Sequence, residues 1–298
     1  MKRYISILSV FALVLSLCAC SSGNFNLKIN RTAVPQEVFN YYLSVAQNDE
    51  QYTDKKDKEK TALELCRKYV AENELIKKYG VALSAEERVS AAADTKAKWL
   101  YYSGFYSENS VSKQTLNLML EHEKLVEDSV IASCSEDGES PLPEKNIKKY
   151  YSKNYAAVQV ISAELTDESG EIADEATVNR IIDDFKKMRN TVRNGEKMES
   201  AAQKYPEVAR YDGKTTVISA FDTSYPAGFF KNVAELKNGE TQAYKYSRVI
   251  YLVHRVDAEE EDGYFSLYSK DCIVRMRKSE FEKKVNTIAQ KYEMVYNK

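Results

Sequence analysis

The chain has 298 residues, with 43 basic and 45 acidic side chains and a net charge of −2. So mild a charge argues against the strongly basic surface that a nucleic-acid-binding protein presents to phosphates. The chain has only two histidines, which argues against a histidine-based metal centre. Beyond Cys18 and Cys20 near the N-terminus it has three widely spaced cysteines, an odd set that fits neither a CxxC metal site nor a disulfide framework. No nucleotide-binding or metalloprotease motif is present, so we expect no cofactor and no metal.

The first 19 residues have the pattern of a secretory signal. Two basic residues precede a mostly apolar run, residues 5–17, that is too short to span a bilayer. The stretch LCAC at positions 17–20 then resembles a bacterial lipobox, whose modified cysteine would be Cys20. We therefore expect cleavage after residue 19, a lipidated tether over residues 20–26, and an extracytoplasmic protein held on the bacterial cell membrane by its acyl chains. Removal of residues 1–19 takes away two positive charges and leaves a net charge of −4.

Residues 27–154 are predicted to form a mainly helical lobe. Pro35 suits a first helical turn, and Gly80 suits the position just after a helix end. The sequence SAEE at 84–87 is a capping box, which predicts a helix start. Apolar residues at helical spacing predict helices near residues 35–45, 61–79, 84–99, 113–131 and 144–151.

Three features of this lobe bear on function. His122 lies in the charged run LEHEKLVED and is expected on the solvated surface. Cys66 lies on an apolar helix face, which favours a buried thiol; the sequence leaves open whether Cys66, Cys134 and Cys272 are all free. Four aromatic residues surround Gly104 and are either core residues, which we favour, or an exposed adaptable surface: Tyr101, Tyr102, Phe105 and Tyr106.

The hydrophobic period changes from helical to alternating at residue 157. Strands are predicted at 157–165, 215–220 and 249–256, with helices at 173–194, 197–204 and 229–236. Beyond a charged hinge at 258–263, a last helix carries an apolar stripe that has no local partner and ends in a strand-like tail at 293–296. We expect this helix, in residues 259–298, to return to the helical lobe, because an isolated apolar stripe must be buried. The predicted fold class is therefore α+β, with a helical lobe bracketing a small α+β domain over residues 155–258.

This layout resembles the PrsA/SurA-type extracytoplasmic foldases, in which a split helical chaperone lobe brackets a parvulin-like domain. The segments that carry the resemblance are INRTAVPQEVFNYYL, LELCRKYVAENELIKKYGVALSAEE, LPEKNIKKYYSKNYAAVQV, FKKMRNTVRNGEKMESAAQKYPE and FFKNVAELKNGETQAYKYSRVIYLVHRVD. They cover nearly the whole mature chain. The resemblance implies a peptidyl-prolyl isomerase fold whose site has one histidine on the first strand and one on the last.

The residues at the family's site positions depart from that pattern. Aligning the strands places Ser162 at the first histidine position and Leu252 at the second. His254 follows two residues later, on the same strand face as Leu252. Tyr225 and Phe229 fall near the apolar pocket positions, so the resemblance implies a substrate groove there. No catalytic residue can be assigned, and the domain is predicted to be catalytically impaired.

Three functions remain open at this stage. The first is a membrane-anchored folding factor that binds unfolded or partly folded exported polypeptides. The second is an active prolyl isomerase of low turnover that uses Tyr225 and Phe229, with Ser162 or His254 polarising the amide. The third is an envelope assembly protein with one dedicated partner. The sequence favours the first through the family resemblance, and it determines neither the clients nor the oligomeric state.

Overall fold

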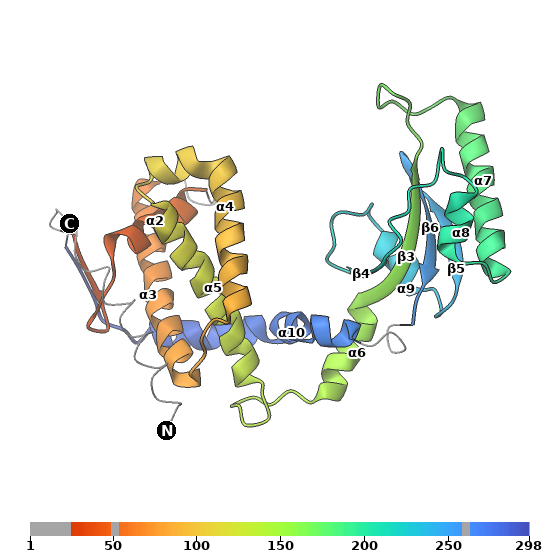
Figure 1. The fold of residues 1–298 in the computed structure, drawn as a ribbon. Helices are drawn as coiled ribbons and strands as arrows, with labels where there is room; N and C mark the ends of the chain where they lie inside the picture. The colour runs from red at the N-terminus through yellow and green to blue at the C-terminus, as the bar shows by residue number, and fades with distance from the viewer. Residues whose placement is uncertain (1–24, 49–53, 258–262, 298) are drawn as a thin grey trace. The chain divides into compact units, whose positions relative to one another are not determined.

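The computed structural model describes residues 25–48, 54–257 and 263–297, so the expected signal segment and Cys20 lie outside the described residues. The described chain forms two compact units (Figure 1). The helical unit contains the described residues up to Pro141 and those from Ile273 onward, and the sheet unit contains Leu142–Cys272. This is the predicted α+β fold class, with a helical lobe completed by the returning C-terminal helix.

The helical unit begins and ends in one small antiparallel sheet. Strand β1 (Asn26–Ile29) lies between β2 (Thr32–Ala33) and β7 (Met294–Asn297). In the β1–β7 ladder Leu27 pairs with Tyr296; Leu27 is buried in the apolar core of the unit, and the partly buried Tyr296 packs against that core. The strand-like tail predicted at 293–296 is therefore a strand, β7, that pairs with β1 near the start of the described chain.

Four helices follow β2 and carry the predicted start and stop signals. They are α2 (Gln36–Asn48), α3 (Lys55–Tyr79), α4 (Ala85–Glu108) and α5 (Lys113–Ser133). Gly80 ends α3 with φ 64°, a left-handed conformation that glycine adopts without steric cost. The capping box is confirmed: the Glu87 amide donates to Ser84 Oγ at 3.1 Å, and the Ser84 amide donates to the Glu87 carboxylate at 2.7 Å. Helix α4 runs about two turns further than predicted, through Gly104.

The C-terminal part of helix α10 (Tyr264–Ala289) supplies the last element of the helical unit. Phe281, Val285 and Ala289 of this helix pack against Ala71 and Leu75 of α3 and Val130 of α5. Each of these six residues is buried, with at most 5% of its surface exposed. Ionic hydrogen bonds join the same elements. Lys284 of α10 and Lys78 of α3 both donate to the Glu139 carboxylate in the loop after α5.

His122 contradicts the expectation of a solvated surface residue. Its side chain is buried, with 6% of its surface exposed, and Nε2 lies 2.8 Å from Oε2 of Glu72 on α3. Its ring lies 4.5 Å from the Tyr69 ring, centroid to centroid. The error has a simple cause: His122 lies on the side of α5 that packs on α3, and its charged sequence neighbours lie on other sides of the helix. Cys66 is buried as expected, and burial raises the pKa of its thiol to about 12.

The sheet unit is built on four antiparallel strands in the order β4-β3-β6-β5. The strands are β3 (Tyr155–Glu164), β4 (Thr215–Ser219), β5 (Thr241–Lys245) and β6 (Val249–Arg255). Helices α7 (Glu175–Arg193) and α8 (Met198–Gln203) pack on one face, and α9 (Phe229–Ala234) packs on the other. Strand β5 was not predicted, because TQAYK is short and only half-buried and has no strong apolar alternation.

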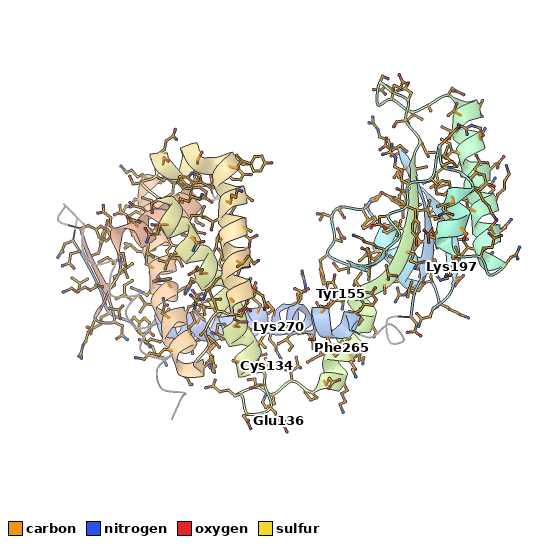
Figure 2. The ribbon with its side chains drawn as sticks, in the orientation of Figure 1. Cys134, Glu136, Tyr155, Lys197, Phe265 and Lys270 are labelled. Carbon is orange, nitrogen blue, oxygen red and sulfur yellow. The ribbon has the colours of Figure 1, made fainter. Side chains whose placement is uncertain are left out.

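Helix α6 (Glu144–Asn154) and the first turns of α10 also belong to the sheet unit. The Tyr151 and Tyr155 rings stack with centroids 5.3 Å apart, and the Phe265 ring lies 5.7 Å from that of Tyr151. Figure 2 shows Tyr155 and Phe265 where α6, β3 and α10 meet. These aromatic contacts explain why the units divide after Pro141 and after Cys272, whereas the sequence pattern changes near residues 154 and 258.

Candidate functional site

The alternation of side chains along β3 and β6 separates the predicted site positions into two groups. Ser162 pairs with Tyr251, and Ile161 pairs with Leu252, in the antiparallel ladder of the two strands. Residues directly opposite one another in such a ladder lie on the same face of the sheet. Leu252 is fully buried with Ile161 under α7 and α8, whereas Tyr251 lies on the face that α9 covers.

His254 lies on the face of Leu252, as the alternation requires, and not on the face that carries Tyr225 and Phe229. Its Nδ1 is 2.8 Å from the hydroxyl of Thr241 on β5, and partial burial lowers the pKa of the imidazole below its usual value. The imidazole is therefore mostly neutral at pH 7 and is held by a strand neighbour. The structure thus separates His254 from the predicted groove residues by the thickness of the sheet.

Tyr225 and Phe229 do meet, and two further tyrosines that the sequence analysis missed join them. We call these four residues the aromatic cluster: Tyr225, Phe229, Tyr246 and Tyr251. The Tyr225 and Phe229 rings stack at 4.4 Å and 5°, and Tyr251 lies at 4.9 Å from Phe229 and 5.8 Å from Tyr225. The alternation in VIYLV places Tyr251 and Leu252 on opposite faces of the sheet. Only the position of α9 shows that Tyr251, and not Leu252, joins the aromatic cluster.

The chemistry of the aromatic cluster is apolar. Phe229 is buried, and burial, reinforced by nearby Asp222, raises the pKa of Tyr225; burial and then Tyr246 raise that of Tyr251. These hydroxyls stay protonated near neutral pH and cannot act as bases. Both histidines of the chain lie elsewhere, His122 in the helical unit and His254 on the opposite sheet face. Ser162 shares the cluster's face, and its backbone N–H and C=O bond to the Arg210 backbone at 2.9 and 2.8 Å.

Among residues 25–48, 54–257 and 263–297, no three histidine, cysteine, aspartate or glutamate side chains come together as metal ligands. None of the helices with assigned positions has the length and hydropathy to cross a membrane.

The second candidate site is a face of α4 in the helical unit. The only buried residues of this helix are Ala91 and Thr95, and the Thr95 hydroxyl lies 2.7 Å from the Ala91 carbonyl and 3.0 Å from Asn117 Oδ1 on α5. The opposite side carries apolar side chains at helical spacing. We call it the α4 surface, made of Val89, Ala92, Ala93, Lys96, Ala97, Leu100 and Tyr101, all exposed.

The exposure of the α4 surface is high for apolar side chains. Val89 is 70% exposed, Leu100 74% and Tyr101 78%. Tyr102, where the helix kinks (φ −125°, ψ 15°), is 58% exposed. The aromatic residues around Gly104 are thus divided: Tyr101 and Tyr102 are on the surface, whereas Tyr106 packs on the core and stacks on Trp99 at 6.1 Å.

Solved structures to which the chain is similar include PrsA foldases and SurA-like chaperones. The foldase protein PrsA from Streptococcus pneumoniae is 15% identical with a TM-score of 0.42, over 87% of this chain and 90% of that one. The foldase protein PrsA from Lactococcus lactis is 13% identical with a TM-score of 0.41, over 89% and 90%. A SurA-like chaperone structure from Campylobacter jejuni is 9% identical with a TM-score of 0.34, over 93% and 100%. No protein-family model and no curated protein sequence matches the chain.

Proposed function

We propose that this protein is a membrane-anchored extracytoplasmic folding factor that binds unfolded exported polypeptides through the α4 surface. The observation that carries the proposal is the exposure of Val89, Leu100 and Tyr101 on one side of a helix whose other side is packed. Soluble monomers rarely leave a contiguous apolar surface without a binding role. An unfolded chain exposes the apolar side chains that such a surface can cover, at little cost per contact and with weak sequence preference.

The test is suppression of aggregation, followed by light scattering as a chemically denatured model protein is diluted into buffer with the mature chain. We expect wild type to delay aggregation and Leu100→Ser to weaken binding about tenfold, because burying a leucine contributes about 1.5–3 kcal/mol and each 1.4 kcal/mol is about a factor of ten. The matched control is Leu267→Ser, since Leu267 on α10 has the same 74% exposure but lies in the sheet unit. Equal suppression by both variants would refute the α4 surface as the binding site.

We propose further that the parvulin-like sheet unit is catalytically impaired. Prolyl isomerisation requires a site that favours the twisted amide over a planar ground state, against a barrier of about 18–20 kcal/mol. The aromatic cluster offers stacked rings, and burial raises the pKa of the Tyr225 and Tyr251 hydroxyls, which stay protonated near neutral pH. Its central Phe229 is buried, and no histidine lies on its face. These features support a packing role for the cluster over catalysis.

The alternative is an isomerase of low activity that uses Tyr225 and Phe229. A coupled proline-isomerisation assay on a short peptide decides between the two. We expect the uncatalysed rate with wild type. A wild-type rate above the uncatalysed rate that falls in Tyr225→Ala or His254→Ala would establish the alternative. The uncatalysed rate in all three proteins supports impairment.

Membrane attachment through Cys20 is proposed from the LCAC pattern at residues 17–20. Its test is independent of the other two. Expression in a bacterium with radiolabelled fatty acid should label wild type and place it in the membrane fraction, whereas Cys20→Ser should lose both. Cys18→Ser is the matched control, because residue 18 follows a bulky leucine and is expected to be removed with the signal.

A further inference from the structure

The sheet of the sheet unit has two edge strands. Its strand order, β4-β3-β6-β5, gives β4 and β5 one ladder each. On the outer side of such a strand, the N–H and C=O groups of alternate residues point away from the sheet. These groups pair with another extended chain unless a charge, a proline or another segment blocks the edge. The contacts at the two edges show which of them is blocked.

The edge of β5 is blocked by cationic side chains. Gln242 pairs with Val253, so its side chain lies on the sheet face that α9 covers. Arg189 belongs to α7, which packs on the opposite face, yet its Nη1 donates to Gln242 Oε1 at 3.3 Å. This hydrogen bond therefore passes round the outer edge of β5. Lys245 adds a second cation at the end of the same strand.

Backbone hydrogen bonds at both ends of the β3–β4 contact show which residues of β3 bond toward β4. The Ala220 N–H donates to the Asn154 C=O at 2.9 Å. Ser162 and Arg210 exchange two backbone hydrogen bonds, at 2.9 and 2.8 Å. Hydrogen-bonded pairs alternate with non-bonded pairs along an antiparallel ladder. The even-numbered residues of β3 therefore bond toward β4.

The outer side of β4 presents backbone groups of its odd-numbered residues. The two even-numbered residues of β4 pair with even-numbered residues of β3, so the N–H and C=O groups of Thr215, Val217 and Ser219 point away from β3. The Ser219 C=O accepts from the Asp222 N–H at 3.2 Å, and no backbone group of a described residue bonds to the others on this side. The strand, TTVIS, contains no charge and no proline. Its edge therefore has none of the side chains that block β5.

We propose that the outer edge of β4 binds an extended polypeptide segment as a fifth strand of the sheet. A row of backbone donors and acceptors at strand spacing is the complement of another extended backbone. Main-chain pairing of this kind discriminates against proline and depends little on the other side chains. The inference rests on the proposed function for its occupant, because unfolded polypeptides expose unpaired backbone groups along their length. It adds a second client-binding surface, in the sheet unit.

The experiment compares two short fluorescein-labelled peptides of alternating threonine and valine, with a lysine at each end for solubility. One is unmodified, and the other is N-methylated at two consecutive central residues, which removes a donor from each edge of the peptide. Each is titrated with the purified mature chain and followed by fluorescence anisotropy. We expect the methylated peptide to bind about tenfold weaker, the effect of about one lost hydrogen bond.

NMR spectroscopy locates the bound peptide. The unmodified peptide should shift the Val217 amide signal and slow its hydrogen exchange. Ala243 on β5 is the internal control. The Arg255 N–H donates to the Glu240 C=O at 2.9 Å, so the odd-numbered residues of β5 point outward, Ala243 among them. Its amide signal should not change, because the edge of β5 is blocked.

Val217→Pro removes one outward donor and leaves the hydrogen bonds to β3 in place, a substitution that edge strands tolerate. It should weaken binding of the unmodified peptide about tenfold, whereas the matched variant Ala243→Pro should not. Should either variant fail to fold, the comparison of the two peptides on wild type still tests the inference.

Three results would overturn the inference and leave the proposed function standing. They are equal binding of the two peptides, binding of neither, and a peptide-induced shift that spares Val217. A wild-type dimer that Val217→Pro dissociates, measured by sedimentation, would assign the edge to a second copy of the chain and overturn the inference as well. Failure of wild type to suppress aggregation overturns the proposed function itself.

Discussion

Phe281→Ala tests whether the helical unit depends on residues that come after the whole sheet unit in the chain. Phe281 is 5% exposed and packs with Leu75 of α3 and Val130 of α5. Truncating a buried phenylalanine removes its transfer free energy and leaves a cavity, a combined loss of about 3–5 kcal/mol. That is a large part of the roughly 5–15 kcal/mol by which a domain is stable.

The chain provides its own reporter for this measurement. Trp99 is the only tryptophan, and it lies on α4 in the helical unit, partly buried against the core. Tryptophan fluorescence in urea therefore follows the unfolding of the helical unit alone. With a slope of about 2 kcal/mol per molar urea, the predicted loss lowers the midpoint by about 2 M.

Leu267→Ala on the same helix is the control, because its side chain is 74% exposed and its removal should leave the midpoint unchanged. Phe281→Leu keeps most of the apolar volume and should fall between the two. A loss below about 1 kcal/mol for Phe281→Ala, within the range of an ordinary surface substitution, would show that α10 does not stabilise the helical unit.

Three further predictions concern a glycine, a carboxylate and a histidine. Gly80→Ala should destabilise the helical unit by about 1–2 kcal/mol in the same urea assay, because φ 64° is costly for alanine; Gly104→Ala, whose added Cβ meets nothing within 4 Å, should be neutral or slightly stabilising, and equal effects would contradict the argument. Hydrogen bonds from Lys284, Lys78 and Tyr79 lower the pKa of Glu139 from 4.5 to about 2, so its contribution is present above pH 4.5 and is lost as the pH falls through 2. Because this carboxylate is solvent-exposed, Glu139→Gln should cost no more than about 1 kcal/mol at pH 7. The cost should shrink as the pH falls from 4.5 through 2, and a cost independent of pH would refute the ion pairing. Burial lowers the pKa of His254, so its effect on stability is absent above pH 6.5 and destabilises the sheet unit as the pH falls below that value; an NMR titration of its imidazole should give a midpoint below 6.5, and a midpoint above it would show a charged partner instead.

Local signals in the sequence located most of the helices. The capping box at Ser84 and Glu87 and the glycine after α3 act through bonds and dihedral angles within a few residues, so the chain needs no tertiary context to show them. The apolar stripe of α10 also predicted that the helix must be buried, and the structure shows the partners, α3 and α5. Periodicity indicates that a helix face is buried but does not identify what covers it.

Burial of polar residues and the assembly of the sheet were less accessible. His122 looked exposed because its neighbours are charged, yet it lies on the side of α5 that meets Glu72 and Tyr69 of α3. Strand β5 was missed, and with it the strand neighbour that holds His254. In both cases the deciding contact comes from a segment distant in the sequence.

The predicted site shows the same division. By itself, the alternation of a strand determined that His254 and Leu252 share one face and that Tyr251 lies on the other. Only the tertiary structure decided that α9 and Tyr225 cover the face of Tyr251, while α7 and α8 cover that of Leu252. The physical reason is that side-chain alternation follows from the geometry of one strand, whereas the side on which a helix packs depends on the path of the loops and on burial across the whole sheet.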